Sequence, residues 1–170
     1  VDAGPVNVDL LGFAAERTDG LVAETERIQR DRISRVEKII ERVESRLAVE
    51  LAIEPSEGIG RPHIARAIAD SDADYDYQGA FDHLIGTGCP CYVPRHIPSF
   101  DRGQELLSEA CAVVALAHPF RYRRVDRALA LLSDLDAVER YYPYHWDVDV
   151  GRLERLLNER DLLAVGGSDA

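Results

Sequence analysis

The chain has 170 residues, of which 46% are hydrophobic, so it can bury a core and is not a disordered segment. Its net charge is −11, which excludes extended binding to duplex nucleic acid, because a polyanion would have to meet a local cluster of positive charge on an acidic surface. The longest apolar stretch, residues 110–117, is far shorter than the about 18 residues that a membrane span needs. We therefore expect a soluble protein with no membrane partner.

The composition also bears on where the protein works. Three cysteines are too few for a disulfide scaffold of this size, which favours a reducing cytoplasm. Lys38 is the only lysine among 20 basic residues, and this preference for arginine, joined to the acidic surplus, is typical of salt-loving microbes; a GC-rich genome gives the same bias. The chain has no methionine and stops directly after an apolar run, so we expect it to be part of a longer protein.

Residues 21–51 are predicted to form one long amphipathic helix. Apolar residues recur there at spacings of three and four, which places them on one helical face. These residues are Ile33, Val36, Ile40, Val43 and Leu47. The opposite face carries oppositely charged pairs four residues apart, such as Glu26 with Arg30, and we interpret it as a solvated face.

Residues 54–99 change to short pieces rich in Gly, Pro and Asp. We expect a helix that begins at Pro62, a second helix over residues 78–85 and a loop over residues 86–98. This texture is typical of a small helical unit rather than of a sheet.

After Ser99, a predicted helix N-cap, apolar runs alternate with amphipathic helices. The apolar runs cover residues 112–117, 137–142 and 162–165, and the helices are expected over residues 125–132 and 150–157. Such alternation is typical of parallel strands in an α/β domain. The sequence therefore predicts one α/β body made of residues 1–20 and 100–170, with a helical unit, residues 21–99, inserted into it.

Polar residues follow the predicted strands. Active-site groups of α/β barrels project from the loops just past the strand ends, where this chain has His118 and, after its last run, Asp169. Imidazole and carboxylate groups hold Zn, Mn or Fe ions, which activate water and neutralise charge on a phosphoryl group. His118 and Asp169 are therefore candidate metal ligands and catalytic residues. The structural alternatives are a histidine capped in a tight turn and an Asx-turn aspartate.

Three motifs, Ala117-His118-Pro119, Gly167-Ser168-Asp169 and the six residues 60–65 (GRPHIA), carry a family resemblance. With Tyr92-Val93-Pro94 and residues 8–13, they make the chain resemble PHP (polymerase and histidinol phosphatase) domain phosphoesterases of the nucleotidase and RNA-trimming branch. The resemblance implies part of a distorted, seven-stranded (β/α)7 TIM-like barrel with a small inserted helical domain. It also implies a cluster of two or three divalent metal ions, Mn, Zn, Fe or Mg, at the barrel rim.

By this resemblance, His118 and Asp169 would be metal ligands. The family's His-x-His, Asp-His and Glu ligands near the N-terminus have no counterpart here, and the His that follows the Gly-Ser-Asp motif would fall one residue past Ala170. We therefore expect the 170-residue chain by itself to bind metal weakly and to be inactive. Asp9 stands where the family usually has His, and it is either a harder ligand that favours Mn or Mg over Zn or a position that has lost the ligand role.

Arg61 and His63 lie at the start of the helix that Pro62 opens. Free backbone N–H groups and the helix dipole favour an anion there, and a guanidinium and an imidazole add charge-assisted donors for phosphate. Arg61 and His63 are therefore candidate substrate-binding residues, and the insertion would act as a lid. The alternative is an ordinary surface arginine and a helix-start histidine.

Two further groups have competing interpretations. Residues 89–91 (Cys-Pro-Cys), with His83 and His96 nearby, could bind zinc, but one intervening residue is fewer than zinc sites use, which favours buried or idle thiols. The aromatic residues of segment 141–146 could stack a base, or fill the seam between a strand and a helix.

The function that we predict is a metal-dependent phosphoesterase, a hydrolase that cleaves phosphate ester bonds through a metal-activated hydroxide. Its partner would be a phosphorylated small molecule, a nucleotide or a short RNA end. The alternative is a non-catalytic PHP-like module that has lost part of its metal site. Another barrel hydrolase with ligands at the same rim would share His118 and Asp169 but would not account for residues 60–65.

Overall fold

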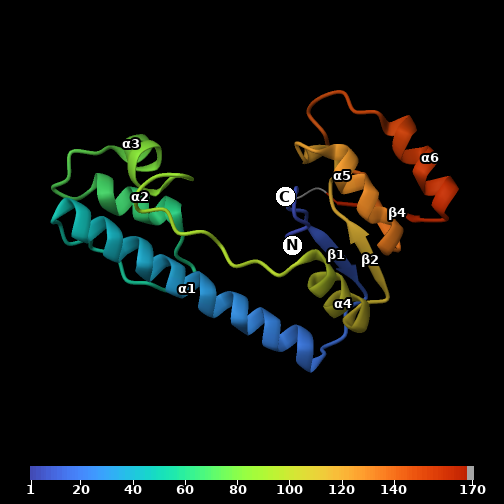
Figure 1. The fold of residues 1–170 in the computed structure, drawn as a ribbon, viewed down its shortest axis with the longest axis horizontal. Helices are drawn as coiled ribbons and strands as arrows, with labels where there is room; N and C mark the ends of the chain where they lie inside the picture. Colours follow the sequence, from blue (N-terminus) through green and yellow to red (C-terminus); the bar gives the residue numbers. More distant parts are fainter. Residues whose placement is uncertain (168–170) are drawn as a thin grey trace. The chain divides into compact units, whose positions relative to one another are not determined.

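The computed structural model describes residues 1–167 and divides into two compact units. The sheet unit consists of Val1–Val22 and of the residues from Ile97 onward, and the helical unit consists of Ala23–His96. Figure 1 shows the strands in the first unit and the long helix α1 leading to the second. None of the helices among residues 1–167 combines the length and the apolar character that crossing a bilayer requires.

The sheet unit is built on four strands in the order β1-β2-β3-β4, which are β1 (Leu10–Phe13), β2 (Val113–Leu116), β3 (Ala137–Tyr141) and β4 (Leu163–Gly166). Strands β2, β3 and β4 run parallel, as the alternation of apolar runs and helices predicts, so a mixed α/β architecture is confirmed. Strand β1 pairs antiparallel with β2, a pairing that the sequence pattern does not indicate.

Three α-helices connect these strands or precede them. They are α4 (Phe100–Ala110), α5 (Val125–Ala130), which continues as the 3₁₀ turn η3 (Leu131–Asp134), and α6 (Val150–Arg160). The predicted N-cap of α4 is confirmed, because the Ser99 side chain accepts a hydrogen bond of 3.2 Å from the backbone N–H of Arg102. These helices cover the sheet with apolar faces.

The core of the sheet unit joins strand residues to helix residues. Its buried side chains include Val114, Leu116, Leu129, Leu132, Val138 and Leu153. Strand β4 differs from β2 and β3, because it is an edge strand and Leu163 on it is 54% exposed.

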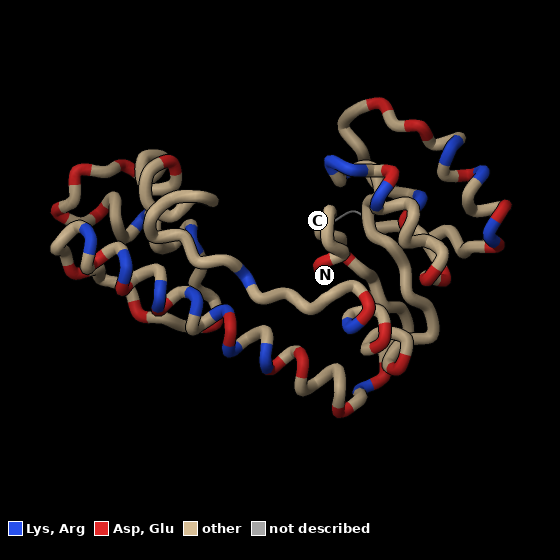
Figure 2. The backbone as a smooth tube through the Cα atoms, viewed as in Figure 1, with Lys and Arg blue, Asp and Glu red and all other residues tan. Residues whose placement is uncertain are grey.

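The helical unit contains most of α1 (Asp19–Leu47), then α2 (Arg61–Ala69) and α3 (Tyr77–Ala80), which continues as the π-helical turn η1 (Phe81–Ile85). Figure 2 shows acidic and basic residues following one another along α1, while the apolar positions that recur in the sequence supply the buried face. The helix that Pro62 was expected to open is confirmed as α2.

A second, separate core holds the helical unit together. Its buried residues come from α1, α2 and the α3–η1 segment and include Val36, Ile39, Val43, Ile64, Ile68 and Leu84. The π-turn ends on Gly86, whose N–H donates to the Phe81 carbonyl at 2.9 Å. A Cβ atom at Gly86 would stand 2.2 Å from that carbonyl oxygen, so this turn requires glycine.

Candidate functional site

His118 lies directly after β2, where the chain turns into the short 3₁₀ helix η2 (Pro119–Arg121). Its backbone has φ +27° and ψ 60°, in the region of positive φ that residues with a Cβ rarely adopt. Such strain persists only where the surroundings hold the residue in place, and it is concentrated at functional sites.

Glu139 on β3 supplies that hold. Glu139 is only 3% exposed. Its carboxylate accepts a hydrogen bond of 2.6 Å from the backbone N–H of His118. A Cβ atom on Gly167 would lie 2.5 Å from the other carboxylate oxygen of Glu139, so glycine lets the end of β4 approach. The ends of β2, β3 and β4 therefore meet at one edge of the sheet, as their predicted parallel arrangement requires.

The His118 imidazole is nearly enclosed, with its side chain 11% exposed. The rings of Tyr122 and Tyr142 flank it at centroid distances of 5.4 and 5.5 Å. Its Nε2 atom lies 3.4 Å from Oδ2 of Asp9, and its buried Nδ1 atom has no hydrogen-bond partner among residues 1–167. The structure thus brings together two residues that are distant in sequence.

Asp9 reaches His118 because its backbone is fixed on both sides. Its carbonyl accepts a hydrogen bond of 3.0 Å from Ala117 N–H, and its own N–H donates to the Tyr122 hydroxyl at 2.9 Å. That hydroxyl in turn donates to the Ala117 carbonyl at 3.1 Å. Burial, followed by smaller contributions that include the charges of Asp9 and Glu139, raises the pKa of Tyr122, so the phenol stays protonated and keeps this bridge.

The chemistry of these donors fits a metal ion in part. Two donors that bind one ion at about 2.1 Å each, with a tetrahedral angle, lie about 3.4 Å apart. Asp9 Oδ2 and His118 Nε2 have this separation, and the Asp9 carboxylate is 71% exposed and open to an ion. Among residues 1–167, no group of three or more His, Cys, Asp or Glu side chains converges on one point. The third predicted ligand, Asp169, lies outside the described residues.

Arg61 and His63 lie in the helical unit, in the first turn of α2. The Nδ1 atom of His63 accepts a hydrogen bond of 3.2 Å from the Gly60 N–H, and the His63 N–H donates to the Gly60 carbonyl at 2.9 Å. His63 therefore stabilises the start of the helix. Because Nδ1 is an acceptor here, the neutral ring carries its proton on Nε2, which faces away from this bond and can still donate.

Arg61 belongs to a cluster of four arginines, which we call the arginine pocket. With Arg32, Arg35 and Arg95, it lines a hollow of about 240 Å³ that Phe81 also borders. No side-chain carboxylate within residues 1–167 forms an ion pair with any of the four. In a chain with a net charge of −11, such a cluster is the local concentration of positive charge that an anion needs.

An aromatic ring orders two of these arginines. The guanidinium carbons of Arg35 and Arg61 lie 5.9 and 5.8 Å from the centre of the Tyr92 ring, and Arg35 Nε donates to the Val93 carbonyl at 2.7 Å. Burial, and after it the charges of Arg61 and Arg95, lowers the pKa of Arg35. The four positive charges repel one another, so an anion bound among them would relieve this repulsion. The sequence pattern identified only Arg61 of these four arginines. Arg32 and Arg35 lie on α1 and Arg95 lies after η1, so all three are distant from Arg61 along the chain.

Solved structures of hydrolases resemble this chain, among them the following two. A crystal structure from Bifidobacterium adolescentis, of a protein assigned as a metal-dependent phosphoesterase, matches it with a TM-score of 0.65 and 24% sequence identity. That match covers 96% of this chain and 62% of the other. An amidohydrolase from Chromobacterium violaceum, with bound sulfate and no metal, matches with a TM-score of 0.68 and 24% identity, over 99% of this chain and 64% of the other.

The likeness to these hydrolases shows a shared fold. The chain spans less than two thirds of the length of either protein. No family model and no curated protein matches it.

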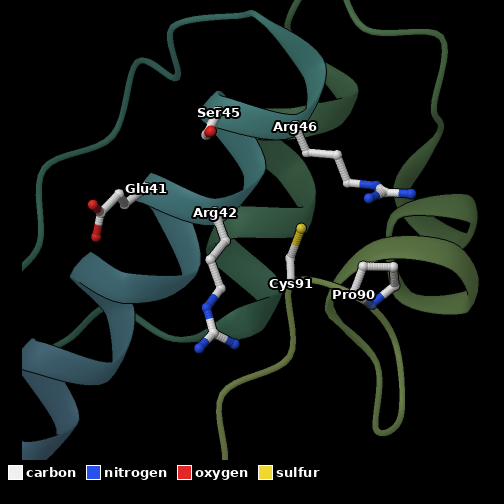
Figure 3. A pocket seen from close by; sticks show the side chains of 6 residues that line it. All are labelled: Glu41, Arg42, Ser45, Arg46, Pro90 and Cys91. Carbon is white, nitrogen blue, oxygen red and sulfur yellow. The ribbon is translucent and has the colours of Figure 1, made fainter.

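A second hollow of the helical unit is bordered by two residues of the cysteine motif, Pro90 and Cys91. It measures about 670 Å³ and is lined by Glu41, Arg42, Ser45, Arg46, Pro90 and Cys91. Figure 3 shows the Cys91 sulfur between the side chains of Arg42 and Arg46, and burial raises the pKa of this thiol. The Cys89 sulfur instead contacts backbone carbonyls at 3.3 and 3.7 Å. The two thiols therefore have different surroundings.

Proposed function

We propose that the protein to which this chain belongs is a metal-dependent phosphoesterase of the PHP type, in its nucleotidase and RNA-trimming branch. The observation that carries the proposal is the pair formed by Asp9 and His118, two groups suited to one ion, at the edge where the parallel strands end. The sheet unit would be part of a distorted (β/α)7 barrel, and the helical unit would be an insertion in it.

The metal site would be held by Asp9, His118 and Asp169, with further ligands from outside this chain. Two or three divalent ions, Mn, Zn, Fe or Mg, would supply an activated water and neutralise charge on the phosphoryl group. The role of this chain's own residues is to prepare the site. Glu139 fixes the His118 backbone, and Tyr122 holds the Asp9 backbone beside the imidazole.

The substrate would be a phosphorylated small molecule, a nucleotide or a short RNA end. The guanidinium groups of the arginine pocket form no ion pair with a carboxylate among residues 1–167, and they support this choice, because forked donors suit phosphate and an acidic surface disfavours long duplexes. Arg61 would bind the phosphate, with the free Nε2–H of His63 as a second donor. The protein would work in the cytoplasm, in keeping with its few cysteines, and the 170-residue chain by itself would be inactive.

Metal content and turnover of the whole protein test this proposal. We expect His118→Ala to leave the far-UV circular dichroism unchanged and to abolish hydrolysis of AMP and of a short 5′-phosphorylated RNA, because the imidazole lies past the end of β2 and is not part of the apolar core. Asp9→Asn should lower the metal content measured by mass spectrometry. Turnover by His118→Ala within about threefold of the wild type would contradict the proposal.

The same experiment separates the competing functions. Wild-type protein that retains no metal and hydrolyses neither substrate would favour the non-catalytic module. Wild-type protein that binds metal but cleaves amides rather than phosphate esters would favour a different barrel hydrolase. Asp9→Asn with unchanged metal content would remove Asp9 from the ligand set and leave His118 in it.

A further inference from the structure

A row of aromatic rings leads away from the candidate metal ligand. The His118 ring contacts Tyr142 at 5.5 Å, Tyr142 contacts Tyr144 at 4.8 Å, and Tyr144 contacts Trp146 at 5.6 Å, all measured between ring centroids. We call residues Tyr142, Tyr144 and Trp146 the aromatic row. Each member contacts its neighbours at tilted or edge-on angles, which is the arrangement that aromatic pairs favour.

The aromatic row is held in place by η2, the short 3₁₀ helix that follows His118. The Phe120 N–H donates to the Tyr144 hydroxyl at 3.2 Å, and Arg121 Nη1 donates to the Tyr142 hydroxyl at 2.9 Å. The Phe120 ring also packs edge-on against Tyr144, and the Arg121 guanidinium lies 5.8 Å from the centre of the Tyr142 ring. The rings are thus ordered before any ligand arrives, which lowers the entropic cost of binding.

The end of the row is open to solvent. Trp146 is 52% exposed, whereas a tryptophan that served only to fill a seam between a strand and a helix would be mostly buried. The only ring that contacts it within residues 1–167 is Tyr144, which leaves much of the indole surface free. An exposed aromatic surface at the outer end of a row of rings that begins at a candidate catalytic residue indicates a binding surface.

We propose that the aromatic row, with Trp146 at its outer end, is a stacking platform for a nucleobase of the phosphorylated substrate. The inference rests on the proposed function, because it takes the phosphate to be processed at His118. A planar base suits the row because every base has a π-face that stacks on aromatic side chains.

Because Trp146 is the only tryptophan of the 170 residues, emission excited at a wavelength that tryptophan absorbs and the seven tyrosines do not reports this position alone. The probes are the 5′-phosphorylated dinucleotide pApA and its abasic analogue, which has the same sugars and phosphates without bases. We expect pApA to quench the Trp146 emission and the abasic analogue to leave it unchanged. Equal quenching by both probes, or by neither while both bind, would overturn the platform.

A variant provides a second, independent measurement. In isothermal titration calorimetry, Trp146→Leu should weaken pApA binding by about fivefold to 150-fold, the range expected for loss of one base stacked on an aromatic ring, and Trp146→Phe should recover part of it. Abasic binding should not change. Tyr141→Leu is the matched control, since Tyr141 is 64% exposed on the same segment but contacts Arg140 rather than the row.

The outcomes distinguish the two proposals. Unchanged pApA affinity in Trp146→Leu, with metal content and turnover of the whole protein intact, would overturn the platform and leave the phosphoesterase standing. Failure of the chain to bind either probe, together with a whole protein that neither binds metal nor hydrolyses phosphate esters, would overturn the proposed function and the platform with it.

Discussion

The sheet unit and the helical unit bring their polar groups together in different ways. In the sheet unit, His118 and Glu139 meet because β2 and β3 are parallel neighbours with Leu116 opposite Val138, which brings the residues that follow this pair together. In the helical unit, the arginine pocket collects side chains from α1, α2 and the segment after η1, which no shared periodicity connects. The position of the site in the sheet unit therefore follows from the order of its parallel strands. The position of the arginine pocket depends instead on how the separate segments of the helical unit pack together.

The two units also differ in what neutralises their charges. The His118 imidazole has a carboxylate 3.4 Å away, so the site offers a nitrogen donor and an anionic oxygen donor to a cation. The arginine pocket has one sign only within the described residues, which suits an anion. Three predictions probe this contrast and the independence of the two cores.

The largest effect is expected from a cavity in the core of the helical unit. Ile39 is completely buried on α1, so Ile39→Ala should lower the free energy of unfolding of that unit by about 2–5 kcal/mol. Urea unfolding followed by far-UV circular dichroism should shift, because most of α1 lies in this unit. The emission of Trp146, which reports the sheet unit, should keep its midpoint.

Leu132→Ala is the matched control, because Leu132 is 1% exposed in the core of the sheet unit. It should shift the midpoint of the Trp146 emission instead. Transitions that move together in both variants would show that the two cores unfold as one cooperative body, and would remove the basis for treating the units separately.

An intermediate effect is expected from Arg61. Since paired hydrogen bonds from a guanidinium to phosphate are each worth about 1.5–3 kcal/mol, Arg61→Ala should lower kcat/KM of the whole protein by about 10-fold to 100-fold or more. Metal content should not change. Arg61→Lys keeps the charge but not the fork, so it should recover only part of the loss.

Arg30→Ala is the control for Arg61, since Arg30 has a side chain that is 70% exposed and lies 3.7 Å from Glu26 on α1. Its kinetics should match the wild type. Unaltered kinetics of Arg61→Ala on a phosphorylated substrate would make Arg61 a structural residue held by Phe81 and Tyr92, and the helical unit would need another role.

The smallest effect is expected from the helix caps. Ser99 caps α4 in the sheet unit and Asp76 caps α3 in the helical unit, where its carboxylate accepts from Gly79 N–H at 2.7 Å. Loss of either cap to alanine should cost about 1 kcal/mol of stability, measured by urea unfolding. Ser99→Ala should shift the unfolding transition followed by Trp146 emission. Asp76→Ala should shift only the transition followed by far-UV circular dichroism. The reverse assignment would contradict the division into units.

The sequence allowed much of the sheet unit to be predicted. The predicted runs that end at Ala117, Tyr142 and Val165 correspond to β2, β3 and β4, because their alternation with amphipathic helices indicates parallel strands. The antiparallel β1 escaped prediction, since Leu10–Phe13 is short and its partner is about a hundred residues away. Local pattern carries no information on such a distant pairing.

The candidate site was predictable only in its chemistry. His118 was identified by its residue type and its place after a strand, and Asp9 by the family resemblance alone; the structure places them together. The part played by Tyr122 was not foreseeable, because its hydroxyl bridges two backbone groups that meet only after β1 has paired. The arginine pocket escaped for the same reason: Arg32 and Arg95 look like surface cations until the chain has folded around them.

The distance along the chain between β1 and β2 has a consequence for folding. Closing a loop of about 100 residues costs about 4 kcal/mol in chain entropy, so β1 cannot pair early. During synthesis, β1 leaves the ribosome before β2, and the helical unit between them can complete its own core before β2 is made. Once that unit has folded, most of the chain between β1 and β2 is no longer flexible. Pairing the two strands then costs less chain entropy. Asp9 therefore meets His118 late, and the site is among the last parts of this chain to form.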